Sequence, residues 1–325
     1  MKLIFTRIVL IGMLNGMAYG DPDKIATNSC QTSIILKLTN VFETSHQEFQ
    51  FDPCVQLSDG HGYSAGIVQF TTGTGSAEQV IQFYSDRVHP NEFTVMNATL
   101  EAITLQLKAG ASGDASGLVS SVAGLDGYCD AWSKASQRPE FRDAQIAMLA
   151  KMYFIPSQKA ATDAGLSYAV SIGQIYDSTI QLGAQGTHEL IQMVTARRGT
   201  PGPQNELEWI SEFLDDREKK LIAMGGAYAP TVTRIKSYQF LVKNNDPNFQ
   251  AMPVHGLDND GKPMNVDCNS EITIPGMNDG IPGGLGLGKP GNSSIFYGAA
   301  MAVESESILM VWWLSFVGIS IWCFL

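Results

Sequence analysis

Two acidic residues near the start of the chain form a candidate acid–base pair. Glu43 is expected at the end of a helix, and Asp59 follows sixteen residues later in a glycine-bounded turn, Ser-Asp-Gly-His-Gly-Tyr-Ser. Hydrolysis of a glycosidic bond needs such a pair, one protonated carboxyl group for the leaving oxygen and one carboxylate on the other face of the sugar. Because the chain has 32 acidic residues, the pair alone does not identify an enzyme.

The residues around this pair predict a mostly helical domain that contains a small β-sheet. Apolar residues recur on one helical face up to Phe42, so we expect a helix that ends near Glu43. A β-prone region follows at 49–70, and Ser76 with Gln79 has the spacing of a capping box that opens the next helix. Further helices are expected near 97–108, 139–153, 164–182, 187–197, 205–223 and 230–243.

The composition is that of an acidic, folded protein. The 325 residues include 32 Asp and Glu against 21 Lys and Arg, which gives a net charge of −11, and 44% of the residues are hydrophobic. Nucleic-acid affinity depends on clustered Lys and Arg, so this balance argues against a nucleic-acid partner. It favours partners that are neutral or positively charged.

Both ends of the chain have the composition of processed segments. Residues 1–20 combine a short basic start, an apolar stretch and small residues, which is typical of a secretory signal peptide. Ile308–Leu325 is uncharged and is preceded by small residues, so 295–325 is predicted to be a GPI-attachment signal, with a membrane-spanning helix as the alternative. We therefore expect a secreted protein that is tethered to the cell surface.

Between these ends we expect one folded domain over 21–275 and a Gly/Pro-rich linker over 276–294. Removing both processed ends takes away two basic and two acidic residues, so the charge of −11 belongs to the remaining chain. Asn-X-Ser/Thr sequences at Asn97 and Asn292 predict glycosylation.

Four cysteines remain once Cys323 is set aside with the terminal segment. They do not form a Cys-X-X-Cys pair or a zinc-site spacing, so no metal site is expected and two disulfides are predicted in an oxidising compartment. Three pairings are possible. We favour Cys54–Cys129 with Cys30–Cys268, the latter joining the two ends of the domain.

Several short segments carry a resemblance that extends along the chain. They are Asn-Val-Phe-Glu43-Thr, Asp59-Gly-His-Gly-Tyr-Ser64, Phe70-Thr-Thr-Gly-Thr-Gly75, Gly173-Gln-Ile-Tyr-Asp177, Arg198-Gly-Thr-Pro201 and 205–217. In their sequence and order, over about 31–250, the chain closely resembles the chitosanases of glycoside hydrolase family 46. The resemblance implies an inverting endo-hydrolase of β-1,4-linked glucosamine chains without a cofactor. It also implies a lysozyme-like, two-lobed α+β fold with a substrate cleft between the lobes.

The resemblance assigns the catalytic roles by position. Glu43 matches the general acid, and Asp59 matches the general base that activates water. Ser64 stands where the family usually has Thr, whose hydroxyl helps to orient that water. Asp177 with Arg198 and Arg217 resembles a charge network beneath the acid, and an ion cluster that only stabilises one lobe is the alternative for these three residues.

Four further residues are candidate substrate contacts. Glu206 resembles a substrate-binding carboxylate of the family, and His61 and Tyr63 belong to the segment around the base. The family commonly has Arg at the position of His61, so a turn histidine without a special role is the alternative reading there. Glu78 lies near Ser76, where the family often has an acidic ligand for the sugar amine.

The expected partner is therefore chitosan, a polycationic glucosamine polymer. The protein is expected to be a monomer. A lysozyme-like muramidase would share the fold, but the acidic lactyl arm of its substrate would be repelled by a domain of this charge. A non-catalytic protein that binds chitosan or cell wall is the alternative from another class.

Overall fold

The computed structural model describes residues 27–56, 62–108, 122–226, 228–270 and 272. Asp59, His61, the linker and both processed ends lie outside these residues. The helices are α1 (Ser29–Thr44), α2 (Ser76–Ser85), α3 (Asn97–Lys108), α4 (Tyr128–Ala135), α5 (Pro139–Leu149), α6 (Ile155–Asp163), α7 (Ala169–Arg198), α8 (Glu206–Met224) and α9 (Thr233–Asn244). The strands are β1 (Cys54–Gln56), β2 (Tyr63–Ala65), β3 (Phe70–Thr71), β4 (Val254–Leu257) and β5 (Pro263–Val266).

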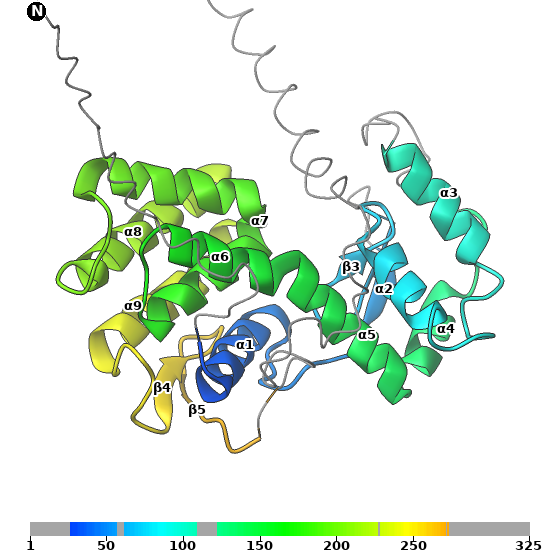
Figure 1. The fold of residues 1–325 in the computed structure, drawn as a ribbon, viewed down its shortest axis with the longest axis horizontal. Helices are drawn as coiled ribbons and strands as arrows, with labels where there is room; N and C mark the ends of the chain where they lie inside the picture. Colours follow the sequence, from blue (N-terminus) through cyan, green and yellow to red (C-terminus); the bar gives the residue numbers. More distant parts are fainter. Residues whose placement is uncertain (1–26, 57–61, 109–121, 227, 271, 273–325) are drawn as a thin grey trace, which may run out of the picture.

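These elements form two lobes, which confirms the predicted, mostly helical α+β class (Figure 1). One lobe contains β1–β3 with α2, α3 and α4, and the other contains α7, α8, α9 and the β4–β5 hairpin. A continuous helical segment joins them, because a π-helical turn at Ala150–Phe154 connects α5 to α6. At its two ends, α5 packs against α2 and α6 packs against α7.

Helix α1 carries Glu43 and has clear start and stop signals. Asn28 and Gln31 form a capping box in which each side chain accepts the other residue's backbone N–H. The middle of the helix is fully buried around Ile35 and Leu38. Ser45 ends it in the left-handed conformation, with φ 62°. The expected end near Glu43 is confirmed, because the apolar stripe stops at Phe42.

The small sheet is antiparallel in the order β1-β2-β3, with Ser64 opposite Val55 on one side and Thr71 on the other. Gly66 follows β2 at φ 76°, a conformation that favours glycine. A Cβ atom there would lie 2.2 Å from Gln145 Oε1 and 2.7 Å from the Trp132 ring. The absence of a side chain at Gly66 is therefore what lets the sheet lie against α4 and α5.

Some predicted boundaries were wrong. Helix α2 does begin at Ser76, but its N-cap is Gly75, and Ser76 Oγ accepts the Thr71 N–H (2.9 Å) instead of forming the predicted capping box. The helix expected at 139–153 continues through α6 to Asp163, since Pro156 lies in the first turn of α6, where a missing N–H is tolerated. Helix α4 was not predicted.

Helix α7 starts later than the expected 164 and runs on to Arg198, with a break at Gly183 (φ 71°, ψ 171°). The sequence predicted two separate helices there, 164–182 and 187–197. The break falls between them, so the two predicted helices correspond to the two halves of α7.

Both predicted disulfides are confirmed. Cys30 in α1 is bonded to Cys268, two residues after β5, and Cys54 in β1 is bonded to Cys129 in α4. Each lobe therefore has one covalent cross-link between segments that are distant in sequence. Within the described residues, no helix is long and apolar enough to cross a membrane.

Candidate active site

Glu43 reaches solvent from the last turn of α1, with its side chain 25% exposed. Its Oε1 accepts a hydrogen bond from Arg234 Nη2 at 2.8 Å. Arg234 comes from the first turn of α9 and is only 6% exposed. The candidate acid is therefore held at the surface by a buried cation from the opposite end of the domain sequence.

Asp177, in the first half of α7, is fully buried and is the centre of the ion pairs behind Glu43. It accepts hydrogen bonds from Arg234 Nη2 (2.6 Å) and Nε (3.1 Å), and from Arg217 Nη1 (2.8 Å). Thr39, one turn before Glu43 in α1, also donates its hydroxyl to Asp177 at 3.3 Å. We call Glu43, Arg234, Asp177 and Arg217 the buried charge array.

The array fixes the charge state of its central carboxylate. Burial alone would raise the pKa of Asp177, but the charges of Arg234 and Arg217 outweigh it and lower that pKa below its usual value. For Arg234, a cation, burial alone would lower the pKa, but the charges of Asp177 and Glu43 outweigh burial and raise that pKa. For Arg217, burial dominates and lowers the pKa. Asp177 is thus ionised between two guanidinium groups at neutral pH.

The predicted network needs one correction, because Arg198 does not belong to it. Arg198 lies at the C-terminal end of α7 and pairs with Glu212 of α8 at 2.9 Å. It is 21 residues from Asp177, in the half of α7 that follows the break at Gly183. Arg234, and not Arg198, is the second arginine that pairs with Asp177.

Sequence reasoning missed Arg234, although a signal was present. Arg234, Tyr238 and Leu241 are spaced by four and three residues, so they share one helical face, and all three are buried. A cation on the apolar face of an expected helix requires a buried partner.

The motif segments around the candidate base pack on each other. Thr72 N donates to the Tyr63 carbonyl (3.0 Å), and Tyr63 N donates to Thr72 Oγ1 (3.0 Å). A Cβ atom on Gly62 would lie 2.3 Å from Thr72 Oγ1, so this approach needs glycine. Ser64 is 3% exposed in β2, and the half-buried Tyr63 ring stacks on Tyr128, with ring centroids 4.9 Å apart. Asp59 and His61 precede this unit, outside the described residues.

The predicted role of Glu206 in substrate binding is wrong, because its carboxylate is fully buried. It accepts hydrogen bonds from the backbone N–H groups of Ser167 (3.0 Å) and Tyr168 (2.8 Å), and from the Ser167 hydroxyl (2.7 Å). Glu206 therefore anchors the start of α7. Glu78 is half-buried in the first turn of α2.

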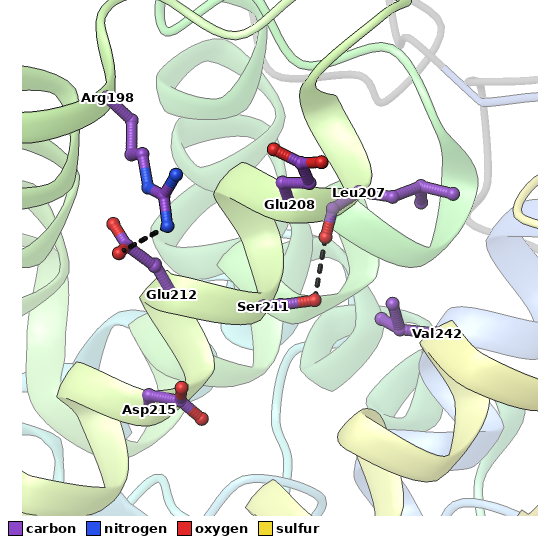
Figure 2. A pocket seen from close by; sticks show the side chains of 7 residues that line it. All are labelled: Arg198, Leu207, Glu208, Ser211, Glu212, Asp215 and Val242. Atoms are coloured by element: carbon purple, nitrogen blue, oxygen red, sulfur yellow. Dashed lines mark hydrogen bonds and ion pairs between the residues drawn. The ribbon is translucent and has the colours of Figure 1, made fainter.

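Two surface cavities are lined by residues outside the buried charge array. The larger, about 420 Å³, is lined mainly by α8 and includes Arg198 (Figure 2). Its lining residues are Arg198, Leu207, Glu208, Ser211, Glu212, Asp215 and Val242. The smaller cavity, about 90 Å³, touches the end of α1 at Val41 and Ser45. In the described part of the chain there is no group of three or more His, Cys, Asp or Glu side chains that could hold a metal ion.

Known proteins similar to this chain are polysaccharide hydrolases. The chitosanase of Bacillus subtilis (strain 168) is 28% identical over 235 residues, which are 69% of this chain and 80% of that protein. The chitosanase of Streptomyces sp. (strain N174) is 26% identical over 217 residues, which are 64% of this chain and 70% of that protein.

Solved structures agree with the fold. A mutant chitosanase from Bacillus subtilis MY002, complexed with 6 GlcN, matches with a TM-score of 0.63 and 26% identity over 74% of this chain and 100% of that one. The Gynuella sunshinyii GH46 chitosanase complexed with chitotetraose matches with a TM-score of 0.62 and 25% identity over 73% of this chain and 98% of that one. The model of glycosyl hydrolase family 46 matches residues 37–250. The chain belongs to glycosyl hydrolase family 46 and is a glycoside hydrolase.

Proposed function

We propose that this protein is an endo-acting chitosanase that hydrolyses β-1,4 bonds between glucosamine units with inversion. Glu43 protonates the leaving oxygen, Asp59 activates water on the opposite face of the sugar, and Ser64 helps to orient that water. The observation that carries the proposal is the hydrogen bond from Arg234 to Glu43, within a chain whose similar proteins are chitosanases.

The buried charge array suits a general acid. Arg234 donates two hydrogen bonds to Asp177 and one to Glu43, so it links the buried carboxylate to the candidate acid. The hydrogen bond from Arg234 thereby orients the carboxyl group of Glu43 at the surface of the domain. A carboxyl group that is oriented and reaches solvent can be placed within hydrogen-bond distance of a leaving oxygen, as a general acid requires.

The acidity of the chain supports a cationic substrate. A net charge of −11 attracts a polymer whose amines are protonated, and it repels the lactyl carboxylates of peptidoglycan. Salt should therefore weaken binding, because it screens exposed charges over about 10 Å at 0.1 M.

A reducing-end assay on fully deacetylated chitosan, chitin and peptidoglycan tests the proposal. We expect hydrolysis of chitosan, with products that first appear as the α-anomer in proton NMR because an inverting enzyme reverses the β configuration. Activity on peptidoglycan instead would identify a muramidase, and binding of chitosan without cleavage would identify a binding protein.

Variants test the assigned roles. Glu43→Gln and Asp59→Asn should each lower kcat by about 10²-fold or more, which is the usual contribution of an acid or base. Glu101→Gln, an exposed change on α3, is the matched control and should leave kcat unchanged. Full activity of Glu43→Gln would contradict the assignment of the acid.

We further propose that the catalytic domain, 21–275, is secreted and tethered to the cell surface by a GPI anchor that replaces 295–325. Two disulfides support an oxidising compartment, and the uncharged run Ile308–Leu325 supports the anchor signal. Phosphatidylinositol-specific phospholipase C should release the enzyme from intact cells. Retention after treatment would indicate a membrane-spanning helix instead.

A further inference from the structure

We propose that Asn259 is a positioning residue for Glu43, an inference that rests on the proposed role of Glu43 as the acid. Asn259 lies in the turn of the β4–β5 hairpin, beyond the residues 37–250 that match the family model. The hairpin lies against the end of the helix that carries the acid.

The side-chain amide of Asn259 closes the last turn of α1. Its Nδ2 donates to the Val41 carbonyl at 2.8 Å and lies 3.4 Å from the Phe42 carbonyl. It is also 3.5 Å from Ser45 Oγ. The Val41 carbonyl also accepts the Ser45 N–H at 2.9 Å, so Asn259 adds an outside donor to the carbonyl whose bond ends the helix, where the last carbonyl groups have few intrahelical donors. The contacts of Asn259 fall on both sides of Glu43 in the sequence.

The turn that presents Asn259 is itself held in place. Asp258 Oδ1 accepts the backbone N–H groups of Asp260 (2.9 Å) and Lys262 (2.8 Å). Asp258 N donates to the Lys262 carbonyl at 2.9 Å, and Gly261 adopts φ 75°. Hydrogen bonds within the turn therefore hold Asn259 in position to donate to α1.

The same hairpin also sets the position of α9, which carries Arg234. The hydroxyl of the buried Ser237, three residues after Arg234, donates to the Leu257 carbonyl at the end of β4 (2.6 Å). The Phe42 ring lies 5.4 Å from the guanidinium carbon of Arg234. The hairpin thus contacts both α1, which carries Glu43, and α9, which carries Arg234, and Asn259 makes the contact with α1.

Packing beside Asn259 is incomplete, so its amide bridges the hairpin turn and α1 next to a cavity. The cavity of about 90 Å³ is lined by Val41, Ser45, Asp258, Asn259 and Asp260. Removing the amide would leave the last turn of α1 next to open space. A small displacement of a catalytic group is costly, since about 1 Å can reduce a rate by roughly 10²-fold.

The test compares Asn259→Ala and Asn259→His with Asn244→Ala. The imidazole Nδ1–H of His occupies the same place in the side chain as the Asn amide, so His can restore the donor. Asn244 is the matched control, because its amide donates to the Phe240 carbonyl in the last turn of α9 (2.8 Å), at the end of that helix opposite Arg234. For each variant, kcat and KM on chitosan are measured at a temperature where all are folded, together with hydrogen exchange of the Ser45 amide.

We expect Asn259→Ala to lower kcat about tenfold with KM within twofold, and to speed exchange of the Ser45 amide about tenfold. Asn259→His should restore most of both, and Asn244→Ala should change neither. Unchanged kcat in Asn259→Ala, an equal loss in Asn244→Ala, or a raised KM alone would overturn the proposal. If the wild type does not hydrolyse chitosan, the proposed function fails. Unchanged hydrogen exchange of the Ser45 amide in Asn259→Ala would separately refute the proposal that Asn259 holds the last turn of α1.

Discussion

Replacing Asp177 by Asn tests the buried charge array most directly. The substitution keeps the shape of the side chain but removes the only carboxylate that Arg217 contacts among the described residues. Arg217 and Arg234 are 0% and 6% exposed, so water cannot compensate the charges that are left. Arg217 would then have only neutral side-chain acceptors, the new amide oxygen and Gln181 Oε1, which lies 2.6 Å from Nη2.

The expected cost follows from this burial. Breaking a buried ion pair by removing one partner costs about 3–5 kcal/mol. For a domain of this size, one kcal/mol shifts Tm by about 2–4 °C, so Tm should fall by roughly 6–20 °C. Activity should fall as well, by about 10²-fold in kcat, because Arg234 would lose the carboxylate that fixes its position and would then hold Glu43 less precisely.

Two further variants separate charge from other effects. Asp163→Asn removes the carboxylate of the Lys159–Asp163 pair, whose side chains are 53% and 63% exposed, so Tm should change by less than about 4 °C. The double variant Asp177→Asn/Arg217→Met removes one of the two stranded cations and should recover part of the lost stability, while activity stays low.

The assays are calorimetry for Tm and the reducing-end assay for kcat. A Tm for Asp177→Asn within 2 °C of the wild type would refute the reasoning, because it would mean that the array carries no uncompensated charge after the change. Recovery of activity in the double variant would refute the link between Asp177 and Glu43.

Three other outcomes follow from the structure. The pKa of Asp177 is lowered in the folded state from its usual value of 3.8. The contribution of Asp177 to stability is therefore complete above that pH and is lost as the pH falls below it. Calorimetry between about pH 5 and 2 should show a steeper loss of Tm in the wild type than in Asp177→Asn. Glu206→Gln should lower the free energy of unfolding by about 1–3 kcal/mol through weaker anchoring of α7, with KM for chitosan unchanged, whereas a raised KM would return Glu206 to the substrate site. Arg198→Ala should cost less than about 1 kcal/mol and leave kcat unchanged, because its pair with Glu212 is exposed; a large loss of activity would show that the array is not the whole network.

The sequence was sufficient to predict features that depend on local patterns. The apolar stripe of α1 predicted a helix end at Glu43, and the oxidising context favoured the two disulfides that are present. These predictions succeeded because periodicity and cysteine usage are readable without knowing how the elements pack.

Features that depend on packing between distant segments were not readable. Arg234 is 57 residues from Asp177 and 191 from Glu43, and only the packing of α1, α7 and α9 brings them together. Arg198 was misplaced because its neighbourhood is decided by the length of α7. Glu206 was misread because a buried carboxylate that caps a helix and one that binds a ligand look the same in sequence.

The bond between Cys30 and Cys268 has a mechanical consequence. It spans 238 residues, so a pull applied to the chain before Cys30 and after Cys268 passes through the disulfide and does not stretch the segments between them. Both lobes, the array and the hairpin that carries Asn259 lie within this closed loop. A tension applied across the two ends of the domain would therefore leave the geometry around Glu43 unloaded until the disulfide is reduced.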